Sequence, residues 1–255
     1  MTKNNSFEKD ISWLLDEKYA GKKSISFYWD IFKLKQGVPL AYVINNIPFL
    51  GCTIDLSYKP LIPRSETEFW VENAIQEIRK KHTLNESIRI LDIYSGSGCI
   101  GIALLKNLPQ TLVSFGEKYD IFLTQIQKNL TLNSITKDRT DIIQTEDLDS
   151  ISHIQFDYIF ANPPYIAKKR EKNVQRSVLS HEPHKALFAI DNGFFHIKKL
   201  LNGSYDLLKT DGIIFIEFDT PQKKELETFI PTELYSYEFQ KDQFGKWRVL
   251  KLTKV

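Results

Sequence analysis

A rigid loop at residues 162–165 carries the clearest chemical signal in the sequence. Asn162-Pro163-Pro164-Tyr165 directly follows an apolar segment, Phe156 to Ala161, whose composition predicts a buried strand. Proline lacks an amide hydrogen and fixes its φ angle, so the two prolines end the strand and stiffen the chain that follows. A stiff loop with an amide and an aromatic ring at a strand end lies where open α/β sheets bind ligands. A plain rigid turn is the alternative interpretation.

The side chains of this loop suit the binding of a planar NH2 group. The nitrogen of such a group is a poor nucleophile because its lone pair is delocalised. Two acceptors, the Asn162 side-chain oxygen and the Pro163 carbonyl, can hold its two hydrogens and turn the nitrogen toward an electrophilic methyl group. The Tyr165 ring offers a flat wall on which a planar group can stack. The loop therefore predicts methyl transfer to a planar amino group.

A glycine loop upstream predicts a nucleotide-like ligand. Asp92 ends an apolar segment, and Gly96 and Gly98 precede a helical pattern. Glycines at this place let a ligand press against the backbone and let the helix pack closely. The next apolar segment ends in Glu117, which can accept both hydroxyls of a ribose or can serve as a solvated helix cap. The spacing fits a dinucleotide and an adenosyl ligand equally well, and only the Asn-Pro-Pro-Tyr loop favours the adenosyl ligand.

The composition is that of an ordinary globular protein. The 255 residues are 42% hydrophobic and 26% charged with a net charge of +2, so no global field favours nucleic acid or membrane. Cys52 and Cys99 lie far apart, match no metal-ligand spacing and predict reduced thiols. The N-terminus lacks an apolar signal core, and no apolar run is long enough to span a bilayer. We expect a cytoplasmic monomer with no metal site.

The elements that must position these residues alternate between strands and helices. Strands are expected at residues 88–94, 111–117, 140–145, 156–161 and 211–218, with two more around Gly245, and helices at 99–107, 118–133, 191–208 and 222–230. This alternation predicts a parallel sheet covered on both faces. Upstream, residues 7–45 have the periodicity of short helices, and a hairpin is expected around Gly51. Ser65 followed by Glu68 predicts a capping box that begins a helix running to about Lys81.

Several stretches between about Gly37 and Lys254 resemble the HemK/PrmC family, the methyltransferases that modify a glutamine of peptide-chain release factors with S-adenosylmethionine. They are PLAYVINNIPFLG, LIPRSETE, LDIYSGSGCIGIAL, FANPPYIA, HEPHKALFAIDNG and KDQFGKWRVL. Asn-Pro-Pro-Tyr alone is shared with amino methyltransferases that act on adenine or cytosine. The arginine–glutamate stretch, the Glu182-Pro183 segment and the closing hairpin are the more specific part of the resemblance.

The resemblance implies an α/β protein with the class I, Rossmann-like fold of S-adenosylmethionine-dependent methyltransferases. This fold has a seven-stranded sheet whose last strand is antiparallel. A short N-terminal helical segment and a β-hairpin would precede it. The implied division is residues 1–45 for substrate docking, 46–66 for a hairpin linker and 67–255 for the methyltransferase domain.

The resemblance also implies roles for individual residues. On the cofactor side, the implied contacts are Asp92, Gly96 and Gly98 with the methionine part, Glu117 with the ribose, Asp147 with the adenine amino group, and Asn162 beside the cofactor. On the substrate side, Asn162 and Pro163 would bind the glutamine amide, Pro164 and Tyr165 would complete the loop, and Arg64 and Glu182 would lie near the active site. A structural ion pair or cap is an equally weighted alternative for Arg64 and Glu182, and a solvated loop acid is the alternative for Asp147.

The sequence departs from the family pattern in three places. Tyr94 replaces a small residue of the glycine loop, and we expect its ring to swing outward and leave the loop intact. Ser65 replaces a proline, and the N-terminal segment is short. Two other functions stay open. The basic stretch Lys168–Arg176 beside the loop suits methylation of a nucleic-acid base, and Tyr94 is the one feature that suits an inactive cofactor-binding scaffold.

Overall fold

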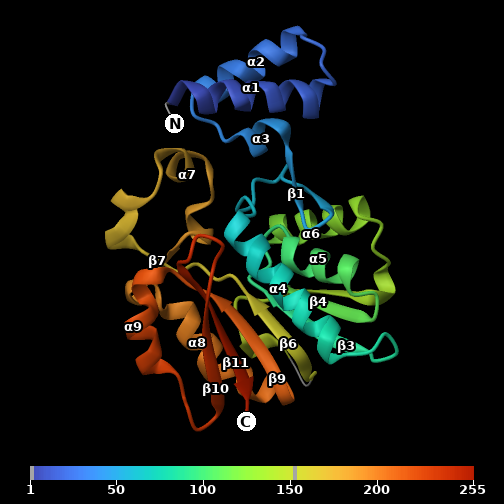
Figure 1. Cartoon of the computed structure of the whole chain (residues 1–255), viewed down its shortest axis with the longest axis vertical. Coiled ribbons are helices and arrows are strands. Elements are labelled where there is room, and N and C mark those ends of the chain that lie inside the picture. The colour runs from blue at the N-terminus through green and yellow to red at the C-terminus, as the bar shows by residue number, and fades with distance from the viewer. Residues whose placement is uncertain (1–2, 152–153) are drawn as a thin grey trace.

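A seven-stranded sheet forms the centre of the protein in the computed structural model, which describes residues 3–151 and 154–255 (Figure 1). Its strands are β3 (Ile88–Ile93), β4 (Thr111–Glu117), β5 (Thr140–Gln144), β6 (Phe156–Ala161), β9 (Leu208–Glu217), β10 (Tyr235–Lys241) and β11 (Trp247–Lys254). They lie in the order β10-β11-β9-β6-β3-β4-β5. The last strand, β11, is antiparallel to both of its neighbours, which confirms the expected architecture.

The strand order reverses beside β3. The chain passes from β3 outward to β4 and β5, then returns to β6 on the other side of β3 and continues to β9. These five strands are parallel, so their C-terminal ends share one edge of the sheet. The crevice outside such a reversal is where open α/β sheets bind ligands. The glycine loop follows β3 and the Asn-Pro-Pro-Tyr loop follows β6, so both loops border this crevice.

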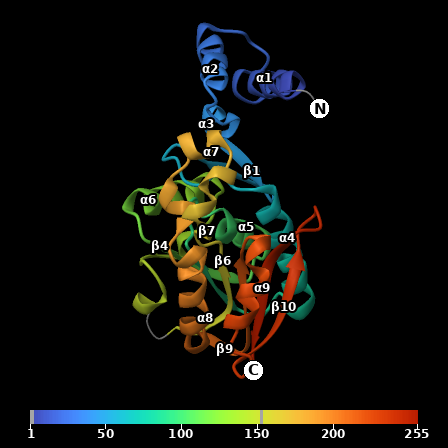
Figure 2. The same cartoon turned by 90° about the vertical axis from the view of Figure 1, so that its left-hand side faces the viewer.

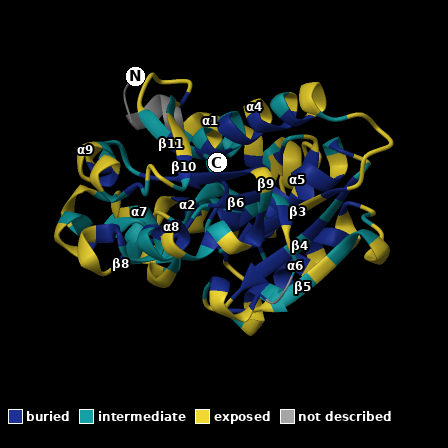
Figure 3. Ribbon diagram, turned by 90° about the horizontal axis from the view of Figure 1, so that it is seen from below, coloured by how far each residue is buried: buried dark blue, intermediate teal, exposed yellow. Residues whose placement is uncertain are grey.

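Helices cover both faces of the sheet (Figures 1 and 3). On one face lie α4 (Ser65–Lys81), α5 (Cys99–Asn107) and α6 (Asp120–Leu132), and on the other lie α8 (Phe195–Leu207) and α9 (Lys223–Leu226). Successive side chains of a strand point to opposite faces, so β3 divides its residues between two cores. Ile88 and Ile90 pack in the first core, and Leu91 and Ile93 pack in the second. Burial on both faces explains why the strands are nearly continuous apolar runs.

Three helices form a small separate layer beyond the sheet (Figures 1 and 2). They are α1 (Lys3–Tyr19), α2 (Ile25–Lys35) and α3 (Leu40–Ile44). Their core consists of the buried side chains of Leu14, Phe27, Leu34 and Val43. Asp30 is buried beside this core, and the ammonium groups of Lys18 and Lys33 each lie 2.7 Å from its carboxylate. Paired charges and a small apolar core therefore hold the layer together.

The expected hairpin is present and is bound to the C-terminal end of α6. It consists of β1 (Asn46–Phe49) and β2 (Cys52–Asp55). The side chains of Asn129 in α6 and of Asn133, its C-cap residue, hold β2. The Asn129 Oδ1 atom accepts a hydrogen bond from the Asp55 backbone nitrogen at 2.8 Å, and Asn133 Oδ1 accepts one from Thr53 at 3.0 Å. The hairpin is thus fixed at the C-terminal end of α6.

A segment between β6 and α8 covers the crevice edge and was not foreseen as structured. It contains β7 (Ile166–Ala167), α7 (Arg176–His181) and β8 (Phe188–Ala189), and β7 and β8 pair in parallel. The basic stretch forms a 3-10 helix at Lys168–Asn173 and then enters α7. One of its cations, Arg170, lies 2.5 Å from the carboxylate of Asp219.

The expected capping box at the start of α4 is wrong. The N-cap position is Arg64, its side chain makes no capping hydrogen bond, and Ser65 is the first helical residue. Glu68 instead accepts a hydrogen bond from the backbone nitrogen of Leu50 at 2.8 Å, which ties α4 to the hairpin. The helix expected to reach residue 208 ends at Leu207, because β9 begins at Leu208. Across the two described ranges, no helix has the length and apolar character to cross a membrane.

Candidate active site

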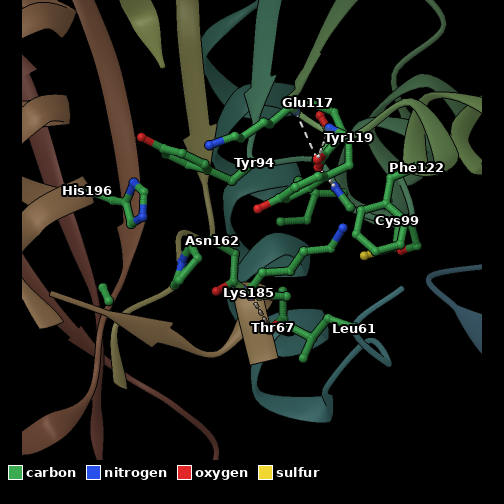
Figure 4. Close-up of a pocket in the computed structure, with 18 of the residues that line it drawn as sticks. Leu61, Thr67, Tyr94, Cys99, Glu117, Tyr119, Phe122, Asn162, Lys185 and His196 are labelled. Carbon is green, nitrogen blue, oxygen red and sulfur yellow. Dashed lines mark hydrogen bonds between the residues drawn. The ribbon is translucent and has the colours of Figure 1, made fainter. Parts of the chain in front are cut away.

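Two adjoining cavities lie at the reversal of the strand order. The first, the glycine-loop cavity, has a volume of about 350 Å³ and is bordered by the loop after β3, the end of β4 and the start of α4 (Figure 4). The second, the proline-loop cavity, has a volume of about 420 Å³ and is bordered by the Asn-Pro-Pro-Tyr loop and the end of β9. The residues that line both are Leu61, Arg64, Asn162 and Ala186. Asn162 therefore stands at the boundary between two ligand-sized spaces.

The two glycines of the glycine loop have different roles. Both have the left-handed backbone that favours glycine, with φ of 55° at Gly96 and 76° at Gly98. Gly96 lines the glycine-loop cavity, and a Cβ atom there would meet nothing closer than 4.0 Å. A Cβ atom at Gly98 would press on Ile126 at 3.2 Å and Ile102 at 3.3 Å. Gly96 thus leaves room for a ligand, whereas Gly98 allows α5 to pack closely against α6.

Glu117 closes one side of the glycine-loop cavity. It is buried, and its carboxylate accepts hydrogen bonds from the backbone nitrogens of Gly96 at 2.9 Å, Lys118 at 2.9 Å and Tyr119 at 3.0 Å. Burial raises the pKa of Glu117, and these backbone hydrogen bonds oppose that shift. The acid at the end of β4 therefore faces the cavity and also braces the glycine loop.

Asp92 lies beneath the glycine loop and does not line the cavity. Its side chain is 1% exposed and accepts a hydrogen bond from the Gly101 backbone nitrogen at 2.9 Å. Burial raises the pKa of Asp92 to about 7, and the negative charge of Glu117 adds to the rise. The structure thus assigns Asp92 a position that supports the turn into α5, and a direct cofactor contact stays a prediction.

The Tyr94 ring does not swing outward, and this expectation is wrong. The backbone of Tyr94 has a left-handed conformation, with φ of 60°. Its ring lies edge-on to His196 of α8, with 5.1 Å between the ring centroids (Figure 4). Both rings line the glycine-loop cavity, and the Tyr94 hydroxyl is buried. The loop is intact, as expected, because the ring packs against α8 instead of crossing the loop.

The structure places Glu146, not Asp147, at the wall of the glycine-loop cavity. Glu146 lines the cavity and lies 2.6 Å from the ammonium group of Lys118. Asp147 begins a 3-10 helix by accepting from the Asp149 backbone nitrogen, and its carboxylate pairs with Lys199. The adenine contact expected of Asp147 stays a prediction, and sequence reasoning missed the neighbouring acid.

The Asn-Pro-Pro-Tyr loop divides its residues between the two cavities. Asn162 lines both, Pro164 lines the glycine-loop cavity, and Pro163 and Tyr165 line the proline-loop cavity. The Asn162 Nδ2 atom lies 3.4 Å from the Thr67 hydroxyl. The Tyr165 hydroxyl donates to Glu217 at 2.9 Å. The loop is therefore held by contacts with α4 and β9.

Arg64 and Glu182 form an ion pair at the rim of both cavities. The Arg64 Nη2 atom lies 2.6 Å from Glu182 Oε1, and the other carboxylate oxygen accepts from the Ile62 backbone nitrogen at 3.1 Å. Glu182 is buried and lines neither cavity, whereas Arg64 lines both. The pair fastens the segment before α4 to the segment after α7, so Glu182 holds Arg64 in place.

Sequence reasoning missed Lys185 and the aromatic rings that it contacts. Its ammonium nitrogen lies 3.2 Å from the centroid of the Tyr119 ring and 4.9 Å from that of Phe122 (Figure 4). All three residues line the glycine-loop cavity. Cations are attracted to the faces of aromatic rings, and this contact brings the Glu182-Pro183 segment over the cavity. A lone lysine after Glu-Pro gives no sequence signal for such a contact.

The strand order, the glycine loop and the position of the paired cavities are those of the class I methyltransferase fold. The family described as Methyltransferase small domain matches residues 74–190. A methyltransferase from Pyrococcus furiosus has the same fold, with a TM-score of 0.56 and 18% identity over 80% of this chain and 89% of that chain. No group of three or more potential metal-ligating side chains occurs in the part of the chain that the structure describes.

Curated relatives identify the family, within this class, to which the chain belongs. The release factor glutamine methyltransferase of Flavobacterium psychrophilum is 36% identical over 229 residues, which cover 88% of this chain and 78% of the relative. The protein of the same name from Streptococcus pneumoniae is 31% identical over 253 residues, covering 97% of this chain and 86% of the relative. The chain belongs to the release factor glutamine methyltransferase family, and the resemblance seen in the sequence is confirmed.

Proposed function

We propose that this protein methylates the side-chain amide nitrogen of a glutamine in a peptide-chain release factor, with S-adenosylmethionine as the methyl donor. The position of Asn162 at the boundary of the two cavities carries the proposal. One cavity would hold the methyl donor, the other would admit the substrate side chain, and the two reactants would meet at the Asn162 amide. Methyl transfer requires such a meeting point because the reacting atoms must be held in line.

The glycine-loop cavity fits S-adenosylmethionine by the chemistry of its walls. The open space over Gly96 admits a ligand against the backbone, and the Glu117 carboxylate suits ribose hydroxyls. The rings of Tyr119 and Phe122 suit a flat base. Glu146, which lines the cavity, would accept from an exocyclic amino group. The cofactor would supply an electrophilic methyl group, and these residues would orient it toward Asn162.

The proline-loop cavity fits a primary amide. Asn162 and the Pro163 carbonyl offer oxygen acceptors, and the Tyr165 ring closes the wall beside them. Two acceptors match the two hydrogens of an amide NH2 group and stabilise the positive charge that develops on its nitrogen. No general base with a tuned pKa is needed, since the methylated nitrogen releases its surplus proton to water. The chain's own contribution is therefore orientation and charge stabilisation.

The N-terminal helices provide a docking surface for the release factor in this proposal. Ile25, Tyr28, Trp29 and Phe32 form one stripe along α2 and are 51–80% exposed. Exposed apolar patches of this kind mark interaction sites. Residues 1–45 would bind the partner, 46–66 would link, and 67–255 would perform the transfer. We further propose that the protein acts as a monomer in the cytoplasm, where release factors work.

Incubation with labelled S-adenosylmethionine and purified substrates tests the proposed function. A release factor should be labelled on one glutamine, and the same factor with that glutamine replaced by alanine should stay unlabelled. Bare DNA and RNA should remain unlabelled at every salt concentration. Labelling of nucleic acid instead of the release factor would contradict the proposal in favour of base methylation. Cofactor binding without labelling of any substrate would point to an inactive scaffold.

A further inference from the structure

Glu217 is a buried carboxylate at the C-terminal end of β9, directly beside the Asn-Pro-Pro-Tyr loop. It is 1% exposed. Its Oε2 atom accepts hydrogen bonds from the Thr67 hydroxyl at 2.7 Å and from the Trp70 indole nitrogen at 2.8 Å, and its Oε1 atom accepts from the Tyr165 hydroxyl at 2.9 Å. A buried carboxylate is costly unless donors satisfy it, and these donors do so. Glu217 therefore joins α4, β9 and the loop after β6.

The direction of each hydrogen bond in this cluster is fixed by chemistry. A carboxylate only accepts and an indole nitrogen only donates. The hydroxyl of Thr67 has a single hydrogen, and its short contact with Glu217 uses it. The Thr67 oxygen can then act only as an acceptor toward its other neighbour, the side-chain amide of Asn162. Glu217 thus sets the polarity of a hydrogen bond in which it takes no part.

This polarity determines which end of the Asn162 amide faces the substrate. The separation of 3.4 Å between Asn162 Nδ2 and the Thr67 oxygen is longer than the usual 2.7–3.2 Å, so the attraction itself is weak. The reverse orientation is disfavoured more strongly, because it would set Asn162 Oδ1 against an oxygen whose hydrogen is already used. The NH2 group of Asn162 consequently faces Thr67, and its oxygen is left for the boundary of the cavities.

We propose that Glu217, acting through Thr67, is a positioning residue that presents Asn162 to the substrate as an acceptor and thereby selects glutamine over glutamate. This inference rests on the proposed function. An acceptor matches the NH2 group of glutamine, whereas it would face an oxygen of a glutamate carboxylate without any hydrogen between them. A reversed Asn162 would offer its own NH2 group and would favour glutamate. Sites with a fixed polar partner reject the unmatched analogue strongly.

The same carboxylate also holds Tyr165 in place. Burial and, to a lesser extent, the negative charge of Glu217 raise the pKa of Tyr165 well above its ordinary value. Its hydroxyl therefore keeps its hydrogen and donates to Glu217. Glu217 thus orients both the Tyr165 ring, which forms a wall of the proline-loop cavity, and the Asn162 oxygen, which is its acceptor.

Two matched pairs of variants test the inference. Thr67→Val removes the hydroxyl at nearly constant volume, and Thr67→Ser restores it. Glu217→Met removes the acceptor, and Glu217→Gln restores an oxygen for Thr67 and Trp70. For each variant we would measure single-turnover methylation of a release factor at saturating cofactor, cofactor affinity by calorimetry, and the affinities of two peptides that differ only by glutamine or glutamate. Melting temperatures show which variants are folded.

Thr67→Val and Glu217→Met are expected to lose about tenfold or more in the preference for the glutamine peptide and in the single-turnover rate, with cofactor affinity nearly constant. Thr67→Ser and Glu217→Gln should recover most of both. The inference would be overturned if folded Thr67→Val or Glu217→Met kept the parental preference for the glutamine peptide. It would also be overturned if neither Thr67→Ser nor Glu217→Gln restored that preference. If one pair does not fold, the other decides. Absence of release-factor methylation by the parent enzyme would instead reject the proposed function, while the peptide preference would still test the inference.

Discussion

The backbone nitrogen of Gly96 donates a hydrogen bond to the carboxylate of Glu117 over 2.9 Å. This bond joins the glycine loop after β3 to the end of the neighbouring strand β4. The two groups that the sequence assigned to different parts of the cofactor are therefore in contact in the folded chain. A ligand that engages Glu117 also affects the backbone of the loop, so the two halves of the cavity act as one unit.

Replacing Glu117 should weaken cofactor binding more than it weakens the fold. We expect Glu117→Ala to weaken the binding free energy of S-adenosylmethionine by about 1–3 kcal/mol, because charged hydrogen bonds to the ribose and the brace on Gly96 are both lost. Glu117→Gln keeps an acceptor for the Gly96 backbone nitrogen, so its cofactor affinity should lie between those of Glu117→Ala and the parent. Isothermal calorimetry measures the effect, and Glu72→Ala, an exposed site on α4, is the control. Equal affinity of Glu117→Ala and the parent would remove Glu117 from the cofactor site.

The fold could be predicted from the sequence because its strands and helices have strong periodic signals. Strands buried on both faces must be apolar throughout, and this pattern survives even in short runs such as β6. The capping box failed for a different reason. Glu68 reaches the backbone of Leu50, a residue eighteen positions away, and no local pattern indicates that a side chain will leave its own helix.

The pH dependence of stability should reveal the buried Asp92. Its pKa is about 7 in the folded protein against 3.8 ordinarily, because burial disfavours the charge. Between these values the folded chain holds a proton that the unfolded chain has released, so raising the pH through this window destabilises the fold. The loss should be at most about 4 kcal/mol at 1.36 kcal/mol per pKa unit. Urea unfolding of the parent and of Asp92→Asn from pH 4 to pH 8 measures it, and an equal slope in both proteins would contradict the assignment.

Gly101 in α5 should be intolerant of a methyl group. A Cβ atom there would lie 2.3 Å from the Phe115 ring and 3.0 Å from the Asp92 carboxylate, both held by the sheet. We expect Gly101→Ala to lower the free energy of unfolding by about 1–3 kcal/mol or more through overpacking. Gly203→Ala in α8 is the matched control, since its Cβ atom would meet Leu148 only at 3.3 Å. Denaturant midpoints compare the two, and similar values would show that α5 can shift to make room.

Site residues that belong to a sequence motif could be predicted. Site residues that only the tertiary fold brings together could not. Asn162 directly follows β6 and Gly96 lies three residues after β3, so the topology places both at the crevice. Glu217 did have a signal, since it is the acid inside the apolar run IIFIEF, yet nothing in the sequence shows that Thr67 lies beside it. Whether Glu146 or Asp147 faces the cavity depends on where the 3-10 helix begins, to within one residue, and the composition of the segment does not determine this.

Asn162 is the residue on which the proposed chemistry depends most. Asn162→Ala should leave S-adenosylmethionine bound while raising the barrier to methyl transfer by about 3–4 kcal/mol, because the amide nitrogen loses the acceptor that orients it. Thr67→Ser serves as the matched control, since it keeps the hydroxyl that faces Asn162.

Asn162→Asp separates orientation from charge. The new carboxylate keeps the size of the side chain but has no hydrogen for the Thr67 oxygen, whose own hydrogen is donated to Glu217. It also adds negative charge next to a sulfonium ion, which favours the ground state of the cofactor. We therefore expect cofactor affinity at least equal to that of the parent and a far slower reaction. Single-turnover methylation of a release factor at saturating cofactor measures the rate. If either Asn162 variant reacts within about threefold of the parent, Asn162 is a turn residue and the plain reading of the loop as a rigid connection is correct.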